Sequence, residues 1–491
     1  MHYHKTSSTS FTLLILLSCA TWRSSSGMIT PSVVRSLHAF AGVGVTSILP
    51  VPNEVLDDDN DDEDILLSFY VGTKRGKMKK VTMKNPKKVR HDDDVHIQCI
   101  EDNDEDGSNK SKTPYPIFSM LSLRINQNHH HIVSGSGDRY ITIWEEQHNR
   151  QEQHQEDGIG VSSSSWRIKS KLGPHTGWVK DLARSQFPED GNNDQDREEE
   201  QERFLFSIGC NCIEVWKTTI HGEQYGHVHK LMIESSVEMG TTLSSDILCL
   251  ATSPAPSYYY NTNDQKKNEQ QEKKQHSYYL FAGGVDGRIH RWTICNNSFS
   301  DAQVVYAPGH DGRVNALLVC HTFRAVVSIG NDGFVNCWML EDCNESSFME
   351  RRVWSVNVND ERNNVVVQES NTIVKLTCSC ILLETQDLAI IGIGTACGQV
   401  LLAELKISND KSSRNSDDDV MTITLLDEMI VVESSSSNTK GVRGGCTIHS
   451  IASQNNHIII GHSEGISIWE PMLLSSNPSS TTFKSVDTGN I

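Results

Sequence analysis

One unit recurs along this chain: a short apolar strand that ends near a small residue, a tight turn, and an alternating strand that ends in Trp. Clear copies span residues 132–144, 204–216, 279–292, 325–338 and 457–469. In the copies whose turns carry Asp138, Asp286 and Asp332, the Trp follows the Asp by six residues. Self-similarity of this kind is the sequence signature of a repeat architecture. The period-two alternation of apolar and polar residues predicts that the repeated unit is a sheet.

Two further copies are degenerate, because residues 65–81 and 388–402 follow the same course without the Trp. Another strand precedes each copy and a fourth strand follows most of them. Seven such units predict an all-β fold: a seven-bladed β-propeller of four-stranded antiparallel blades, with disordered polar loop insertions. Since two copies lack the Trp, rings of six or eight blades are the alternatives.

The repeats place the propeller at residues 30–470. Its blades are expected at about 38–84, 95–145, 166–217, 230–294, 303–340, 352–405 and 423–470. After Trp469 the chain runs into a Ser/Pro-rich tail, 471–491, for which disorder is predicted. The last blade therefore lacks an outer strand of its own, and residues 32–37 are predicted to supply it. Pairing the two ends would remove the free sheet edge and close the ring.

The units resemble WD repeats, and the resemblance covers about residues 30–470. In that family a Gly-His before the first strand, a Ser or Thr on the second, an Asp in the turn and the Trp form a hydrogen-bonded set inside a blade. The resemblance implies such structural sets in four units: Gly309-His310, Ser328, Asp332 and Trp338 in the fifth; Ser134, Asp138 and Trp144 in the second; His175, Ser207 and Trp216 in the third; Asp286 and Trp292 in the fourth. Ala282 stands where the fourth unit would have Ser, and Glu145 follows Trp144 where the family has Asp.

His310, Ser328 and Asp332 are also the residue types of a hydrolase triad. We interpret them as structural, because they belong inside a sheet and no nearby loop offers oxyanion donors. A tight turn favours Asp, and a buried Trp needs a partner for its indole N–H. A propeller-based enzyme, a hydrolase or a small transferase, is the alternative. It would need carboxylates or His converging on the central opening, and since no such cluster recurs in successive units, no catalytic residue is predicted.

Three other clusters carry the residue types of metal ligands. His129–His131 are expected in a polar hairpin turn, where three adjacent side chains cannot converge on one ion. The thiols of Cys210-x-Cys212, like those of Cys378-x-Cys380, are expected to share one strand face, but no second Cys/His pair lies at zinc spacing. The sequence therefore predicts no metal and no other cofactor.

Charge limits the class of partner. The chain has a formal charge of −19, and four tracts, 57–64, 101–106, 189–203 and 417–419, together carry −21. The remainder is close to neutral, which argues against nucleic acid, because a nucleic-acid face requires clustered Lys and Arg. We interpret the single basic run, Lys74 to Arg90, as a solvated strand edge. No site for a small-molecule substrate is evident.

Function is expected to follow from shape. A propeller is a rigid disc with loops on both rims, and WD-repeat relatives bind peptides or partner domains at the narrow rim, where the tight turns lie. By position, Arg139, Trp178, Arg288 and Arg313 are expected near that rim, and Arg and Trp dominate interface energetics. Three Arg favour an acidic or phosphorylated segment. We therefore expect a protein-interaction scaffold for a protein or peptide partner whose identity the sequence does not encode.

The amino terminus resembles a targeting signal. A weak positive charge in Met1 to Lys5 precedes the apolar stretch Phe11 to Ala20, which ends in small residues. The stretch is too short for a stable membrane span. Thirteen Cys, an odd number at irregular spacing, favour a reducing compartment instead. Residues 1–26 therefore leave localisation open between a secreted or organellar binding module and a cytoplasmic or nuclear protein.

Overall fold

The computed structural model of the chain describes residues 30–37, 40, 43–51, 65–84, 95–100, 115–126, 129–148, 164–185, 203–218, 224–233, 246–254, 277–295, 298–300, 303–305, 309–340, 352–358, 374–386, 388–408, 420–431, 446–455 and 457–472. The targeting segment predicted at 1–26 lies outside these residues. So do the acidic tracts, apart from Arg203, and all of the predicted tail after Met472.

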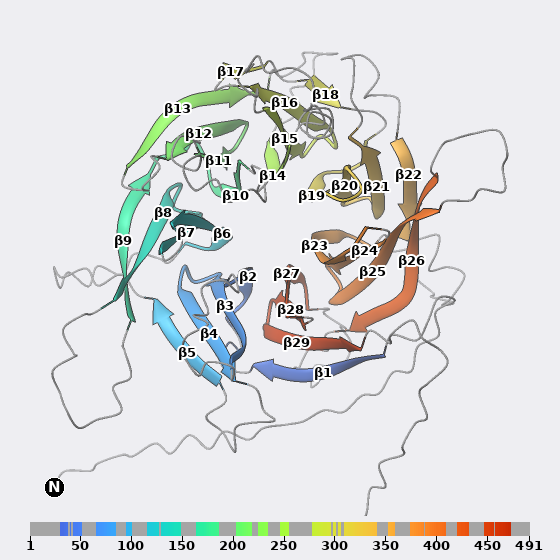
Figure 1. Cartoon of the computed structure of the whole chain (residues 1–491), viewed down its shortest axis with the longest axis horizontal. Coiled ribbons are helices and arrows are strands. Elements are labelled where there is room, and N and C mark those ends of the chain that lie inside the picture. Colours follow the sequence, from blue (N-terminus) through green and yellow to red (C-terminus); the bar gives the residue numbers. More distant parts are fainter. Residues whose placement is uncertain are drawn as a thin grey trace, which may run out of the picture.

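Seven antiparallel sheets follow one another around a central opening (Figure 1). Each sheet extends from the opening to the periphery, and we number the sheets as blades 1 to 7 in chain order. The fold class predicted from the repeats, a seven-bladed β-propeller of four-stranded antiparallel blades, is confirmed. No helix in the described part of the chain is long and apolar enough to cross a membrane.

The strands of each blade are given from the opening outwards. Blade 1 contains β2 (Val45–Pro50), β3 (Ile65–Thr73), β4 (Met78–Lys84) and β5 (Val95–Ile100), and blade 2 contains β6 (Ile117–Asn126), β7 (His129–Ser136), β8 (Ile141–His148) and β9 (Ser164–Leu172). Blade 3 contains β10 (Val179–Arg184), β11 (Arg203–Gly209), β12 (Cys212–Thr218) and β13 (Tyr225–Met232). Blade 4 contains β14 (Ile247–Pro254), β15 (Ser277–Gly284) and β16 (Ile289–Cys295), and its outer position is shared by β17 (Ser298–Phe299) and β18 (Gln303–Val305).

Blade 5 contains β19 (Val314–Cys320), β20 (Ala325–Gly330), β21 (Phe334–Met339) and β22 (Arg352–Asn357). Blade 6 contains β23 (Leu376–Glu384), β24 (Leu388–Thr395), β25 (Gln399–Ser408) and β26 (Val420–Val431). Blade 7 contains β27 (Ile448–Gln454), β28 (His457–His462), β29 (Gly465–Met472) and β1 (Thr30–Leu37). The sheets are offset by one strand from the units expected from the sequence. The unit expected at 95–145 starts with β5, which pairs with β4 and forms the outer edge of blade 1.

The last blade is built from both ends of the propeller. β1 pairs antiparallel with β29, with Thr30 opposite Met472 and Leu37 opposite Ile466. The strand from the amino-terminal side thus covers the outer edge that β29 would otherwise expose. A ring joined in this way cannot open at blade 7 without breaking a sheet.

Every innermost strand bulges near its start. In all seven blades the register against the second strand shifts just after the first residue of the innermost strand, for example between Val45 and Ser47. A bulge re-aims the side chain of its extra residue. These residues line the central opening: Thr46, Phe118, Lys180, Leu248, Asn315, Thr377 and His449.

Polar bulge residues also connect neighbouring blades. Thr377 Oγ1 donates a hydrogen bond to the Ile448 carbonyl of blade 7 at 2.7 Å. Thr46 Oγ1 and Asn315 Nδ2 donate in the same way to the first carbonyl of the next innermost strand. The bulge therefore supplies both the lining of the opening and part of the contact between blades.

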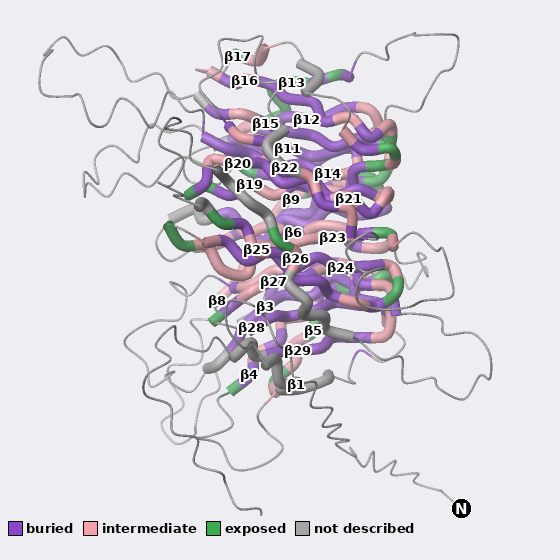
Figure 2. The backbone as a smooth tube through the Cα atoms, turned by 90° about the vertical axis from the view of Figure 1, so that its right-hand side faces the viewer, coloured by how far each residue is buried: buried purple, intermediate pink, exposed green. Residues whose placement is uncertain are grey.

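Apolar side chains fill the space between blades. Blades 5 and 6, for example, share one buried cluster that includes Val327 and Ile329 of β20 and Ile391 and Ile393 of β24. The buried runs cross the body of the ring in Figure 2, and many of the exposed residues lie where the strands end. The alternation that revealed the strands in the sequence is thus the pattern of packing against the two adjacent blades.

The basic run is a correction to the sequence interpretation. Residues 74–77 form the turn between β3 and β4, and the run continues into β4, which pairs with β3 and β5 and is therefore not an edge strand. Lys80 forms an ion pair with Glu146 of blade 2 at 3.8 Å, and Lys79 lies over the Phe40 ring. The part of the run after residue 84 lies outside the described residues.

Candidate functional site

Blade 5 brings together the four side chains of the most complete repeat. His310 Nδ1 lies 3.1 Å from Asp332 Oδ1, and His310 Nε2 lies 2.9 Å from Ser328 Oγ. Trp338 Nε1 donates to the same Ser328 oxygen at 3.1 Å. Because the Asn336 Nδ2 group also points at His310 Nε2, His310 Nε2 is a hydrogen-bond acceptor. His310 Nδ1 is therefore the N–H group of the ring, and it donates a hydrogen bond to Asp332.

The geometry of this set fits a structural role. Ser328 is fully buried, and its oxygen already serves both the indole and the imidazole. Asp332 also accepts from the backbone N–H groups of Asp311 and Phe334, which fixes the turn. The hydrogen bond from His310 lowers the pKa of the Asp332 carboxyl against the opposing effect of burial. A hydroxyl held in this way has no free path to an incoming substrate.

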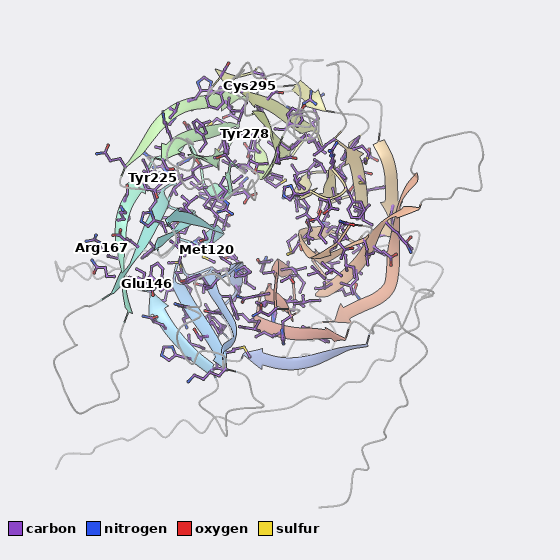
Figure 3. The ribbon with its side chains drawn as sticks, viewed as in Figure 1. Met120, Glu146, Arg167, Tyr225, Tyr278 and Cys295 are labelled. Atoms are coloured by element: carbon purple, nitrogen blue, oxygen red, sulfur yellow. The ribbon has the colours of Figure 1, made fainter. Side chains whose placement is uncertain are left out.

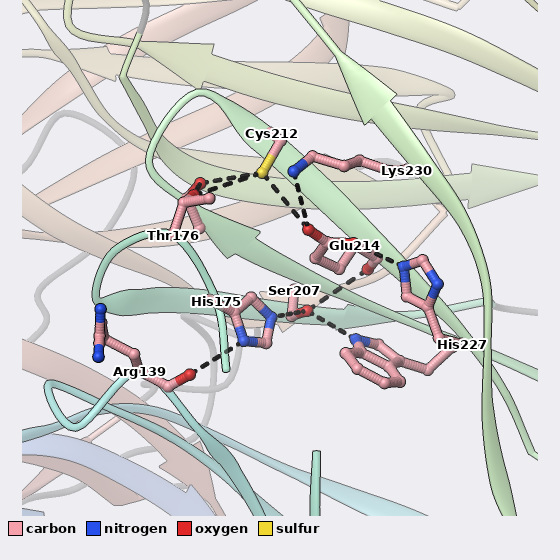
Figure 4. A network of polar contacts seen from close by, with 10 residues as sticks. Arg139, His175, Thr176, Ser207, Cys212, Glu214, His227 and Lys230 are labelled. Carbon is pink, nitrogen blue, oxygen red and sulfur yellow. Dashed lines mark hydrogen bonds and ion pairs between the residues drawn. The ribbon is translucent and has the colours of Figure 1, made fainter. Parts of the chain in front are cut away.

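Blade 3 forms a similar set without the Asp (Figure 4). His175 Nε2 lies 2.7 Å from Ser207 Oγ, which accepts from Trp216 Nε1 at 2.9 Å. Where blade 5 has a carboxylate, the His175 Nδ1–H points to the backbone carbonyl of Arg139 in blade 2, at 3.1 Å. Burial lowers the pKa of His175. The sequence could not reveal this substitution, since a backbone carbonyl leaves no trace in residue type.

The remaining sets are partial. In blade 2, Trp144 Nε1 donates to Ser134 Oγ at 3.0 Å, and Asp138 accepts from the Tyr140 N–H within the turn. In blade 4, Asp286 holds the turn in the same way, and Trp292 is buried beside Ala282.

Blade 7 keeps the Trp of the pattern but lacks the Ser. Ile460 occupies the position of the Ser, because it lies two residues after the partner of Trp469 in β28, as Ser328 does relative to Trp338 in β20. The buried Nε1 of Trp469 has no hydrogen-bond partner within the described part of the chain.

The four residues expected at the narrow rim form two separate pairs. Arg139 and Trp178 belong to the junction of blades 2 and 3, where the His175 N–H donates to the Arg139 carbonyl. Arg288 and Arg313 belong to the junction of blades 4 and 5. Arg288 contacts Asp286 at 3.8 Å, so its charge is partly compensated, whereas Arg139 and Arg313 are exposed.

An aromatic platform lies at the junction of blades 2 and 3, and we define it as Tyr115, Phe118 and Trp178. Trp178 is 54 % exposed and stacks on Phe118, with ring centroids 5.6 Å apart and planes at 23°. Tyr115 is 50 % exposed. Trp178 was expected at the rim from the sequence, whereas Tyr115 and Phe118 were not, although two aromatic residues within four positions were a signal that could have indicated them.

A cavity of about 570 Å³ occupies the end of the central opening next to this platform, and the centre of the ring is open in Figure 3. Its lining includes the seven bulge residues and Lys74, Trp178 and Asp181. Asp181 accepts from Ser119 Oγ of blade 2 at 2.9 Å and from the Leu250 N–H of blade 4 at 2.9 Å. Burial raises the pKa of Asp181 to about 6, while burial and Lys74 lower that of His449 to about 4.

The candidate metal clusters lie differently from the sequence expectation. His129–His131 belong to strand β7 rather than to a hairpin turn, and His131 is buried against Tyr225 of blade 3 at 2.7 Å. Figure 3 shows Tyr225 and Arg167 at the outer side of these blades. Cys210 lies in a turn at a φ of 60°, before β12 begins at Cys212, so the two thiols do not share a strand face. Among the described residues no three His, Cys, Asp or Glu side chains are grouped to hold a metal ion.

The chain folds as a seven-bladed β-propeller, and blades 2, 3 and 5 contain buried Ser–Trp pairs similar to those of WD repeats. Residues 117–145, which extend from β6 into β8 of blade 2, match the family model of the WD domain, G-beta repeat. The resemblance to WD-repeat proteins that the sequence motifs indicated is therefore confirmed.

One solved structure supports the same fold, and two others are similar at lower scores. The crystal structure of RRP9 WD40 repeats is similar with a TM-score of 0.50 and 14 % identity, over 92 % of this chain and 100 % of that chain. The structure of U3-55K gives 0.49 and 14 % over 89 % and 97 %, and the WD40 β-propeller domain of Doa1 gives 0.47 and 13 % over 90 % and 96 %. Comparison with curated protein sequences gave no match.

Proposed function

We propose that this chain is a protein-interaction scaffold that binds a protein or peptide partner at its narrow rim. The observation that carries the proposal is the exposed indole of Trp178, stacked on Phe118 beside the central cavity. Aromatic side chains dominate the binding energy of protein interfaces, and contiguous exposed apolar patches mark interaction sites. WD40 propellers typically serve as scaffolds of this kind.

The charge of the rim supports an acidic partner. Arg139 and Arg313 are exposed there, and Lys74 and Lys180 line the cavity, with the Lys180 ammonium 4.0 Å from the Asp246 carboxylate. Guanidinium groups bind carboxylates and phosphates through paired hydrogen bonds, and Coulomb attraction adds to association rates. Arg288 contributes less, because Asp286 already faces it. No catalytic role is proposed for the His–Ser–Asp set of blade 5, whose hydroxyl is buried and fully engaged.

Affinity purification with the full chain as bait tests the proposal. We expect Trp178→Ala, or the pair Arg139→Glu and Arg313→Glu, to remove partners that the wild type retains. Gln386→Glu is the control, because this exposed residue lies in the β23–β24 turn on the opposite rim. An unchanged set of partners with both rim variants, in folded protein, would contradict the assignment of the narrow rim.

A further inference from the structure

The turn between the second and third strands has a demanding backbone position. In blades 1, 4, 5 and 6 the residue at this position is Gly76, Gly287, Gly333 and Gly398, with φ between 69° and 85°. Blade 2 places Arg139 there, at a φ of 73°. This left-handed region is open to glycine and costs free energy for a residue with a side chain.

The fold requires the left-handed conformation at this position. In blade 4 the Gly287 carbonyl accepts the N–H of His310 in the next blade, and in blade 2 the Arg139 carbonyl accepts the N–H of His175 in the same way. Glycine would make this backbone contact equally well. The local structure therefore does not explain why a side chain stands at position 139, and strained residues of this kind are typically retained for function.

The Arg139 side chain is available for an outside contact. It is exposed, and within the described part of the chain its guanidinium makes no hydrogen bond or ion pair, in contrast to Arg288. The hydrogen bonds of Arg139 all involve its backbone: its carbonyl accepts from His175, as Figure 4 shows, and its N–H donates to the Ser136 carbonyl.

The aromatic platform lies against the same turn. The Gly137 N–H donates to the Pro116 carbonyl at 2.9 Å. A Cβ atom at Gly137 would lie 3.5 Å from both the Phe118 ring and the Tyr115 Cβ, an ordinary van der Waals distance, so the platform lies directly against this turn. Trp178, stacked on Phe118, completes the surface. The turn that carries Arg139 and the three aromatic residues thus lie together at the junction of blades 2 and 3.

We propose that Arg139 and the aromatic platform form the anchoring subsite for a protein segment in which an Asp or Glu neighbours an aromatic or branched aliphatic side chain. This inference rests on the proposed function and assigns the chemistry of its partner. The apolar side chain stacks on Trp178 and Phe118, and the carboxylate pairs with Arg139. A carboxylate fits better than a phosphoryl group, because Asp138 precedes Arg139 in the turn and opposes a second negative charge.

Three matched peptides test the chemistry. Each has the same twelve-residue sequence with a central Phe, preceded by Asp, Asn or phosphoserine, and binding to the full chain is followed by fluorescence anisotropy. The frame comes from selection of a random twelve-residue display library against the full chain. We expect the library to yield acidic–aromatic pairs, and the Asp peptide to bind at least about tenfold more tightly than the Asn peptide. Selected peptides without such a pair, or a preference for phosphoserine, would overturn the proposal.

Variants of the chain separate this inference from the wider proposal. We expect Arg139→Asn and Trp178→Ala each to lower the affinity for the Asp peptide by about tenfold or more. The affinity of Arg139→Lys should lie between those of the wild type and Arg139→Asn. Arg75→Asn, at an exposed arginine in the equivalent turn of blade 1, should leave affinity within about twofold. Unchanged binding with Arg139→Asn, but lost binding with Arg313→Glu, would retain the rim and refute the subsite. Binding indifferent to every rim variant would refute both.

Thermal unfolding excludes loss of fold as the cause. Asn tolerates the left-handed region and Gly adopts it freely, so the melting temperatures of Arg139→Asn and Arg139→Gly should not fall below that of the wild type. Stability that is kept or raised, together with lost peptide binding, is the result that a purely structural role cannot produce. A clear drop in melting temperature with both variants would show that Arg139 serves the fold and would overturn the proposal.

Discussion

Ser328→Ala is expected to destabilise blade 5 strongly for a change of one atom. The Ser328 oxygen accepts the indole N–H of Trp338 and donates to His310 Nε2, and the residue is fully buried. Removing it leaves a buried N–H donor and a buried ring nitrogen with a lost partner, and each such loss costs about 1–3 kcal/mol. We expect a total cost of about 2–4 kcal/mol, since Asn336 still reaches His310 Nε2.

Urea unfolding followed by tryptophan fluorescence, with hydrogen exchange of the blade 5 amides as a local readout, measures this cost. A ring of this size unfolds with an entropy of about 2 cal/mol/K per residue, so a loss of 1 kcal/mol lowers the melting temperature by only about 1 °C. Chemical unfolding is therefore the sharper assay. The double variant Ser328→Ala with Trp338→Phe should cost clearly less than the sum of the single changes, because both remove the same hydrogen bond.

Ser134→Ala is the matched control. Ser134 receives the indole of Trp144 at 3.0 Å, but no His faces it among the described residues of blade 2. We expect about half the cost of Ser328→Ala. A cost below about 0.5 kcal/mol at Ser328, or additive single and double variants, would refute the view that the set stabilises the blade.

Three further predictions concern the ring. Asp181→Asn should gain stability relative to the wild type as the pH rises from 4 to 6. Burial raises the pKa of Asp181 in the folded protein to about 6, so between the ordinary pKa of an Asp and this value ionisation favours the unfolded chain. Urea midpoints measured against pH check this, and a constant difference between the two proteins would contradict it. Ile460→Thr should cost much less than Ile460→Ala, since a hydroxyl there gives the Trp469 N–H a partner while most of the packing remains; equal costs in urea unfolding would count against it. Removing residues 1–37 deletes β1 and should make blade 7 amides the fastest to exchange; unchanged protection would mean that β1 does not hold the ring closed.

The sequence predicted the architecture because each blade repeats the same packing problem. The six-residue spacing in sequence from Asp332 to Trp338 recurs after Asp138 and Asp286. It recurs because these six residues span one tight turn and one strand that must place its Trp between blades. The periodicity survives even where the motif is lost, as in blade 6, where Ala403 packs in the position of the Trp.

The candidate site was less accessible to sequence reasoning. The side chains of Arg139 and Trp178 were predictable from turn position, but their pairing, and the separation of Arg288 and Arg313 on another junction, depend on which blades adjoin. The platform residue Phe118 projects into the opening only because β6 bulges there, and no residue type announces a bulge. The replacement of an Asp by the Arg139 carbonyl is likewise a contact between segments 36 residues apart that the backbone alone provides.

The pairing of β1 with β29 sets an order of events during synthesis. Thr30 leaves the ribosome before the other strands of the ring, and its partner Met472 follows only roughly 440 residues later. At about 5–20 residues per second this delay is on the order of 20–90 seconds. Throughout that interval six blades are able to assemble while β1 has no partner, so the strand that finishes the ring must stay accessible and free of wrong pairings. The step that closes the ring therefore follows the synthesis of all the other strands, although it uses the strand that is made before them.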